Sequence, residues 1–98
     1  MDASIAIQVL PKVETNEEVC KIVDQVIEYI KRTGLTYHVG PFETTIEGDF
    51  EELMDIIKEC QYIAINRGAP SVMSYVKIYF KPEGGALTIE EKIGKHNR

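Results

Sequence analysis

The order of the periodic segments restricts the fold of this chain more than any other feature of its sequence. Residues 4–11 and residues 72–80 alternate between two kinds of side chain, which is typical of β-strands with one buried face. Between them lie two segments with apolar residues at spacings of three and four, which is typical of amphipathic helices. The apolar stripes are Val19, Ile22, Val23, Val26, Ile27 and Ile30 in the first, and Leu53, Ile56, Ile57, Cys60, Ile63 and Ala64 in the second.

Local signals predict where the two helices begin and end. Thr15 and Glu18 form a capping box before the first helix, and Gly34 suits the left-handed position that follows it. Asp49 and Glu52 have the same spacing and predict the start of the second helix. Two short β-prone runs, residues 35–39 and 44–48, are separated by a Gly-Pro turn and therefore predict a hairpin.

The predicted order is strand, helix, strand, strand, helix, strand. Two right-handed crossovers interleaved in this way give a ferredoxin-like βαββαβ fold of the α+β class. Its four-stranded antiparallel sheet carries both helices on one face. The 98 residues allow one domain, 1–98, in which we expect residues 87–94 to form a short helix or an added strand. We expect residues 95–98 to be frayed.

Composition excludes several classes of function. The net charge of −5 and the lack of a long basic run argue against nucleic acid as a partner. The sequence has neither an apolar stretch of bilayer length nor a signal peptide at its start, so we expect a cytoplasmic protein without a membrane partner. Cys20 and Cys60 are interpreted as small buried hydrophobes. His38 and His96 lie too far apart in the sequence to suggest a metal site.

Two helices cover only one face of such a sheet, so the other face must meet solvent or a partner. That face is predicted to carry Ala6, Gln8, Thr45, Glu47, Met73, Tyr75 and Tyr79, with Thr36 or Tyr37 according to the register. Tyrosine and methionine are enriched where an interface or a ligand is buried. We therefore expect another subunit to cover this face. The alternative is a solvent-exposed sheet face that simply tolerates these residues, which would show the same pattern.

Glu47 stands out because a carboxylate in mid-strand has poor β-propensity. One interpretation is a solvated, outward-pointing residue. The other is a carboxylate in a partly buried pocket that accepts hydrogen bonds from a ligand or faces a cation, with Thr45 beside it. No Ser–His–Asp set and no Gly-rich phosphate loop occurs, so we expect a protein that is not an enzyme.

Residues 34–48 resemble the small thiamine-binding protein family of bacteria, archaea and fungi. The family pattern is approximately G-L-x-Y-x-x-x-P-x-x-T-x-x-E-G. The matching positions are Gly34, Leu35, Tyr37, Pro41, Thr44, Glu47 and Gly48. The first strand, which ends in Pro11, and the late pair Glu91-Lys92 also resemble the family, so the similarity covers nearly the whole domain. The chain departs from the pattern at Ser71, where members usually carry a basic residue.

The resemblance implies subunits that stack through their open sheet faces into homodimers and homotetramers, with thiamine or its precursor near the interface. Glu47 could then bond the aminopyrimidine or balance the cationic thiazolium. Tyr37 or Tyr75 could stack on a ring, with Thr45, Gln8 and Ser74 as neutral partners. The alternative hypothesis is a structural or regulatory assembly module without a vitamin ligand. An enzyme of the same fold is a further alternative, which the missing nucleophile and base make weaker.

Overall fold

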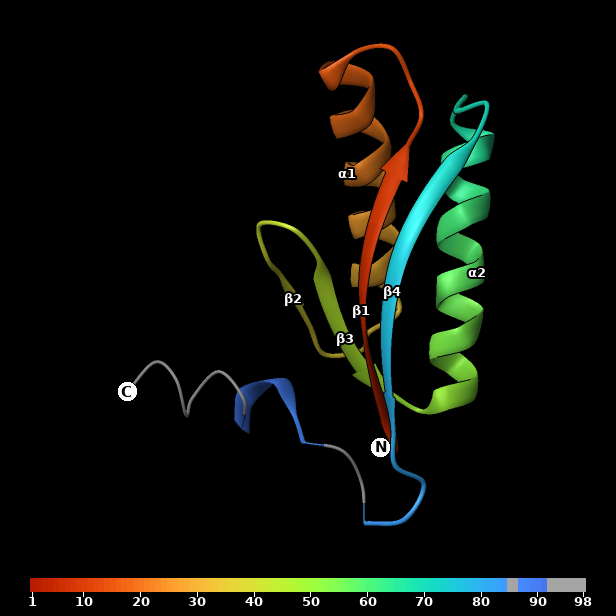
Figure 1. Ribbon diagram of the computed structural model, residues 1–98. Helices are drawn as coiled ribbons and strands as arrows, with labels where there is room; N and C mark the ends of the chain where they lie inside the picture. Colours follow the sequence, from red (N-terminus) through yellow and green to blue (C-terminus); the bar gives the residue numbers. More distant parts are fainter. Residues whose placement is uncertain (85–86, 92–98) are drawn as a thin grey trace.

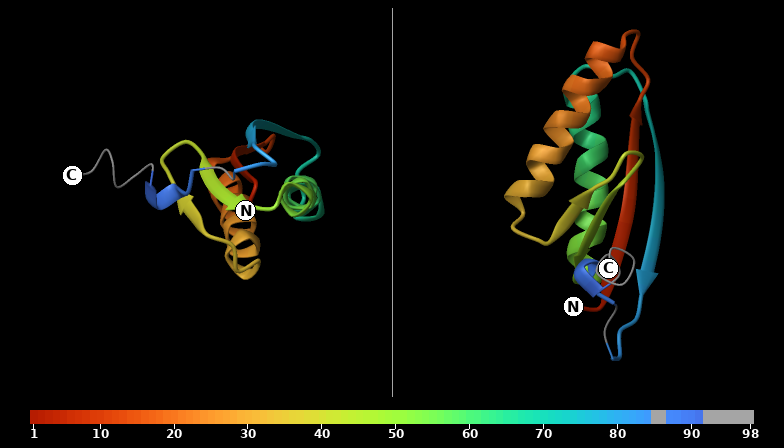
Figure 2. Two further views of the ribbon diagram at one scale, coloured as in Figure 1. Left: turned by 90° about the horizontal axis from the view of Figure 1, so that it is seen from below. Right: turned by 90° about the vertical axis from the view of Figure 1, so that its left-hand side faces the viewer.

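The computed structural model describes residues 1–84 and 87–91 and has the predicted ferredoxin-like fold (Figure 1). The elements are β1 (Ala3–Pro11), α1 (Asn16–Arg32), β2 (Tyr37–Val39), β3 (Thr44–Gly48), α2 (Phe50–Asn66) and β4 (Val72–Phe80). The antiparallel sheet has the order β2-β3-β1-β4. Both helices lie on the same side of it, as the right-hand view of Figure 2 shows. No helix within the described residues is long and apolar enough to span a membrane.

The hairpin differs from the predicted one in its first strand. β2 comprises only residues 37–39, although the sequence predicted a strand from residue 35. Leu35 instead packs against the core, where its Cδ1 lies 3.1 Å from the position that a Cβ on Gly48 would occupy. A side chain at position 48 would therefore displace Leu35, so Gly48 serves close packing as well as ending β3.

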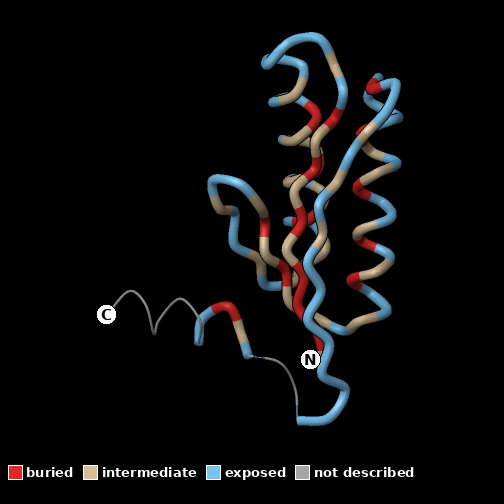
Figure 3. Tube along the Cα trace, in the orientation of Figure 1, coloured by how far each residue is buried: buried red, intermediate tan, exposed pale blue. Residues whose placement is uncertain are grey.

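The core lies between the sheet and the two helices. Its most deeply buried large side chains are Ile5, Ile30, Ile46, Leu53 and Cys60. In Figure 3 the buried residues follow β1 and the inward sides of both helices, whereas most of β4 is exposed. The packing thus confirms the period that predicted each helix and β1, whereas along β4 the alternation of burial extends only to Lys77, and Ile78 and Phe80 are exposed.

The two cysteines have different environments, which corrects the expectation that both are buried. Cys60 is fully buried in α2, and burial raises the pKa of its thiol to about 12. Cys20 is exposed. It follows Val19 by one residue and is turned by about 100° of helix rotation from it, away from the sheet.

We expect alkylating reagents to separate the two thiols. The thiolate is the reactive form, so iodoacetamide at about pH 8.5 should modify Cys20 in the native protein and Cys60 only after unfolding. Mass spectrometry of native and denatured samples checks which thiol is modified, and two adducts under native conditions would contradict this expectation.

The raised pKa of Cys60 also affects the stability of the fold. The free energy of unfolding should fall as pH increases from about 9 toward 12, because the thiol loses its proton at a lower pH in the unfolded chain than in the folded one.

The two helices are capped in different ways. The Thr15 side chain accepts a hydrogen bond from the Glu18 amide at 3.1 Å, as predicted. Asp49 occupies the N-cap position of α2, but its side chain makes no capping bond. The bond comes instead from Asp2, whose Oδ1 accepts from the Phe50 amide at 2.9 Å. The expectation of a local cap pair at Asp49 is therefore wrong in its bonding, because the carboxylate that holds the start of α2 comes from Asp2, just before β1, and binds the amide of the first helical residue.

The segment after β4 returns to the sheet. Residues 89–91 form a helical turn, and Thr88 Oγ1 accepts a hydrogen bond from the Glu91 amide at its start. Ile89 is buried, and its amide donates to Glu47 Oε2 at 2.6 Å. Of the two forms expected for residues 87–94, the described part is thus helical. The fraying expected for residues 95–98 lies outside the described residues.

Candidate functional site

The side of the sheet opposite the helices, here called the open face, is set by the strand register. Paired residues of antiparallel strands point to the same side. Gln8 pairs with Tyr75, Ala6 pairs with Thr45 and Lys77, and β2 places His38 beside Thr45. The open face comprises Ser4, Ala6, Gln8, Leu10, His38, Thr45, Glu47, Met73, Tyr75, Lys77 and Tyr79.

Four of the six predicted ligand-binding residues lie on this surface, namely Gln8, Thr45, Glu47 and Tyr75. They come from the three strands β1, β3 and β4. Gln8 and Tyr75 face each other across one strand pair, while Glu47 lies two residues along β3 from Thr45. The structure therefore brings a carboxylate, a hydroxyl, an amide and an aromatic ring onto one surface.

The other two predicted residues are on the wrong side of the sheet for this site. Tyr37 pairs with Ile46 and packs, half-buried, against the core, so His38 takes its expected place on the open face. Ser74 pairs with Val9, and its hydroxyl donates to Gln61 Oε1 of α2 at 2.7 Å. Because side chains alternate along a strand, neither residue reaches the open face without a change of register.

Glu47 is half-buried on the open face, and its carboxylate accepts the Ile89 amide. This bond is short, 2.6 Å between nitrogen and oxygen, and bonds to charged oxygens are shorter than those to neutral ones. A carboxylate has about four lone-pair sites, so one amide does not exhaust its capacity to accept. Glu47 can thus hold the C-terminal segment and still bind a donor or a cation.

A shallow hollow of about 280 Å³ lies on the open face beside Thr45. Its lining comprises Ser4, Ile5, Ala6, Glu43, Thr45, Lys77, Ile78 and Tyr79. Lys77 Nζ lies 2.8 Å from Glu43 Oε1 at its rim. Sequence reasoning did not include these two charges in the site. The alternation along β4 could have found Lys77, whereas Glu43 lies in a turn that gave no signal.

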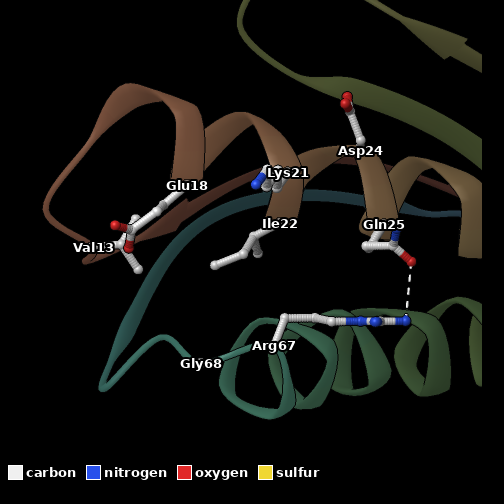
Figure 4. Close-up of a pocket in the computed structure, with 8 residues that line it drawn as sticks. All are labelled: Val13, Glu18, Lys21, Ile22, Asp24, Gln25, Arg67 and Gly68. Carbon is white, nitrogen blue, oxygen red and sulfur yellow. Dashed lines mark hydrogen bonds between the residues drawn. The ribbon is translucent and has the colours of Figure 1, made fainter.

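A larger hollow of about 540 Å³ lies on the other side of the molecule, between α1 and α2 (Figure 4). Arg67 extends across it from the end of α2, and its Nη2 donates to Gln25 Oε1 at 3.1 Å. Charges of both signs surround it, including Glu18 and Lys21. None of its lining residues belongs to the open face, so it is separate from the predicted site.

The open face offers several kinds of group for binding. In residues 1–84 and 87–91, no cluster of three or more His, Cys, Asp or Glu side chains is arranged to hold a metal ion. The open-face groups are two tyrosines, the Glu47 carboxylate, the Lys77 ammonium paired with Glu43, and neutral donors and acceptors. Such a surface can stack on a flat ring, accept N–H groups and balance a positive charge.

Comparison with known proteins identifies a matching family and several related bacterial proteins. The model of the thiamine-binding protein family matches residues 5–97. A UPF0045 protein of Clostridium perfringens is 45% identical over 93 residues, which are 95% of each chain. A domain of unknown function from Bacillus cereus is 34% identical, with a TM-score of 0.87 over 98% of this chain and 90% of its own. A candidate thiamine biosynthesis or salvage protein of Thermotoga maritima is 36% identical, with a TM-score of 0.81 over 98% and 99%.

Proposed function

The chain belongs to the thiamine-binding protein family, and from this premise we propose that it binds thiamine or a thiamine precursor on its open face. In this proposal the protein works in the cytoplasm and releases its ligand unchanged. The observation that carries the proposal is the half-buried Glu47 carboxylate on a surface that also holds Thr45, Gln8 and Tyr75.

The chemistry of thiamine suits these groups. Its aminopyrimidine donates and accepts hydrogen bonds, and its thiazolium ring is a cation. Glu47 can accept the amino N–H or balance the thiazolium charge, and a charge-assisted bond is about twice as strong as a neutral one. Tyr75 offers a π-face to the cation, and Gln8 opposite it offers an amide to the polar edge of a ring. Thr45 supplies a hydroxyl next to Glu47.

We also propose that the open face is buried against the open face of a second subunit, giving a homodimer or homotetramer with the ligand near the interface. Tyr75 is 60% exposed and Tyr79 is 54% exposed in the single chain, and Met73 lies beside them uncovered. Amphipathic aromatic residues and methionine are enriched in the buried centres of interfaces, where charged residues are depleted. A ligand between two such faces would contact groups from both subunits.

Thermal unfolding with and without thiamine tests the proposal, because a ligand that binds only the folded state raises the melting temperature. At a thiamine concentration of about 100 times the dissociation constant, binding increases the free energy of unfolding by about 2.7 kcal/mol. For a domain of this size we therefore expect the melting temperature to rise by about 10–20 °C. Protein concentration is held fixed, because oligomers melt at temperatures that depend on it.

The free pyrimidine, the free thiazole and the thiamine phosphates serve as comparison ligands in the same assay. A rise with the pyrimidine alone would identify the ring that Glu47 recognises. No rise with any of them would contradict the proposal in favour of the assembly module without a vitamin ligand. Recovery of altered thiamine after incubation would contradict the absence of catalysis.

A further inference from the structure

The described turn that follows β4 is anchored at the end of β3. β4 ends at Phe80 on one edge of the sheet, and β1 separates it from β3. The turn of residues 89–91 lies on the β3 side of β1, as Figure 1 shows. Ile89 is only 6% exposed, and its amide donates to Glu47 Oε2 at 2.6 Å. A buried side chain and a short hydrogen bond therefore hold the turn beside Glu47.

The hydrogen bond from Ile89 fixes how Glu47 presents its carboxylate. A free glutamate side chain has several rotatable bonds, and a ligand that binds one orientation must overcome the loss of the others. The Glu47 amide donates to the Thr36 carbonyl at 3.1 Å, so the backbone of this residue is held as well. With Oε2 bonded to Ile89, the direction of Oε1 is set before any ligand arrives.

The Ile89 amide is not needed by the turn in which it lies. Thr88 Oγ1 accepts from the Glu91 amide at 3.0 Å and caps the turn. The first amide of a helical turn has no carbonyl partner within that turn. The bond from Ile89 to Glu47 thus joins the turn to the sheet, and its removal leaves the internal bond of the turn in place.

We propose that Ile89 is a positioning residue of the ligand site: its amide holds Oε2 of Glu47, so that Oε1 accepts a hydrogen bond from the amino group of the pyrimidine. This inference rests on the proposed binding of thiamine on the open face. Ile89 does not touch the ligand in this arrangement and acts through Glu47. The turn after β4 then belongs to the binding site, although it lies outside the strands that carry the other ligand groups.

A carboxylate can accept from Ile89 and from a ligand together. It has about four lone-pair sites, and the Ile89 amide occupies one of them. The alternative is competition, in which the ligand displaces the Ile89 amide and releases the turn. The two arrangements have opposite consequences. Loss of the Ile89 N–H weakens binding if the amide positions Glu47, and strengthens binding if the amide competes with the ligand.

Three variants at position 89 separate positioning from competition. Ile89→Pro removes the N–H, and proline is favoured at the first position of a helical turn. Ile89→Ala and Ile89→Val keep the N–H, and because one side chain is smaller and the other larger than proline, they control for the lost apolar contact. In calorimetric titration with thiamine we expect the proline variant to bind about 3- to 10-fold more weakly than either control, since a free side chain must be ordered on binding. Equal or tighter binding by the proline variant would overturn the proposal.

A second pair of variants tests whether Ile89 acts through Glu47. The Glu47→Ala background has no carboxylate to position, so adding Ile89→Pro should leave its thiamine affinity unchanged within about 2-fold. The same loss in both backgrounds would overturn the proposal, because a merely structural effect of proline does not depend on Glu47. Ile89 lies outside the core cluster between the sheet and the helices, so all of these variants should melt close to the wild type without ligand.

Amide hydrogen exchange, followed by NMR, provides a test in the unmodified protein. The Ile89 amide should stay protected when thiamine saturates the site, because the ligand uses Oε1 of Glu47 and leaves Oε2 to Ile89. Faster exchange of this amide on addition of thiamine would show that the ligand displaces it, and would overturn the proposal.

The inference and the proposed function fail in distinguishable ways. If the wild type does not bind thiamine, the proposed function fails, and the positioning role of Ile89 fails with it. If the wild type binds thiamine and the proline variant binds equally well, the ligand site remains and only the role of Ile89 is removed.

Discussion

Glu47→Gln is expected to weaken thiamine binding by about 10- to 100-fold, since bonds to charged groups contribute about 1.5–3 kcal/mol. Glutamine keeps the shape of the side chain and an oxygen that can still accept the Ile89 amide. It lacks the negative charge that would balance the thiazolium and strengthen a bond from the amino group. The melting temperature of the free protein should therefore change little, while calorimetric titration shows the loss of affinity.

Glu28→Gln is the matched control for this variant. Glu28 is an exposed carboxylate of α1, on the side of the sheet opposite to the open face. Its substitution changes the net charge by the same amount without touching the proposed site. Equal affinities for wild type, Glu28→Gln and Glu47→Gln would remove Glu47 from the site.

Tyr75→Lys is expected to have the second large effect, a reduction of the oligomer. Burial of an unpaired ammonium group costs several kcal/mol for each ion, and a symmetric interface contains one ion from each subunit. Light scattering should show a smaller assembly of the 11.1 kDa chain at concentrations where the wild type is associated. The variant should still fold, because Tyr75 is exposed in the single chain.

Thr45→Lys tests the open face at a second position. Thr45 lies on β3, which β1 separates from β4, so this variant places a charge on the open face but on a different strand from Tyr75. If both lysine variants are smaller than the wild type, the open face is an interface. Unchanged masses for both would contradict burial of the open face.

Local periodicity accounts for most of what the sequence predicted. The stripe from Val19 to Ile30, the alternation of residues 4–11 and the first part of the alternation in residues 72–80 recur in the structure, because amphipathic period and burial are directly linked. The order of the elements then restricted the topology, because right-handed crossovers leave few ways to connect these strands in one sheet. The fold therefore followed from patterns that a single sequence contains.

The candidate site was predicted less completely because it depends on pairing between distant segments. Tyr37 was assigned to the ligand site because it matches the family pattern. The apolar alternation of Leu35, Tyr37 and Val39 already indicates that its side chain faces the core. Ser74 was included for its hydroxyl, but the apolar side of β4 turns it toward Gln61. The bond from Ile89 to Glu47 joins residues 42 apart, and no local signal indicates it.

The cap on α2 has a consequence for how the fold can be divided. The chain looks like a βαβ unit that occurs twice, yet the helix of the second unit takes its N-terminal hydrogen bond from Asp2 of the first. The backbone of Asp2 also accepts from Lys81, at the far end of the second unit. A chain cut between the two units would leave the second without its cap, and exchange of one unit for the other would remove it as well. The two halves thus share one plan, but the second depends on Asp2 of the first for the start of its helix.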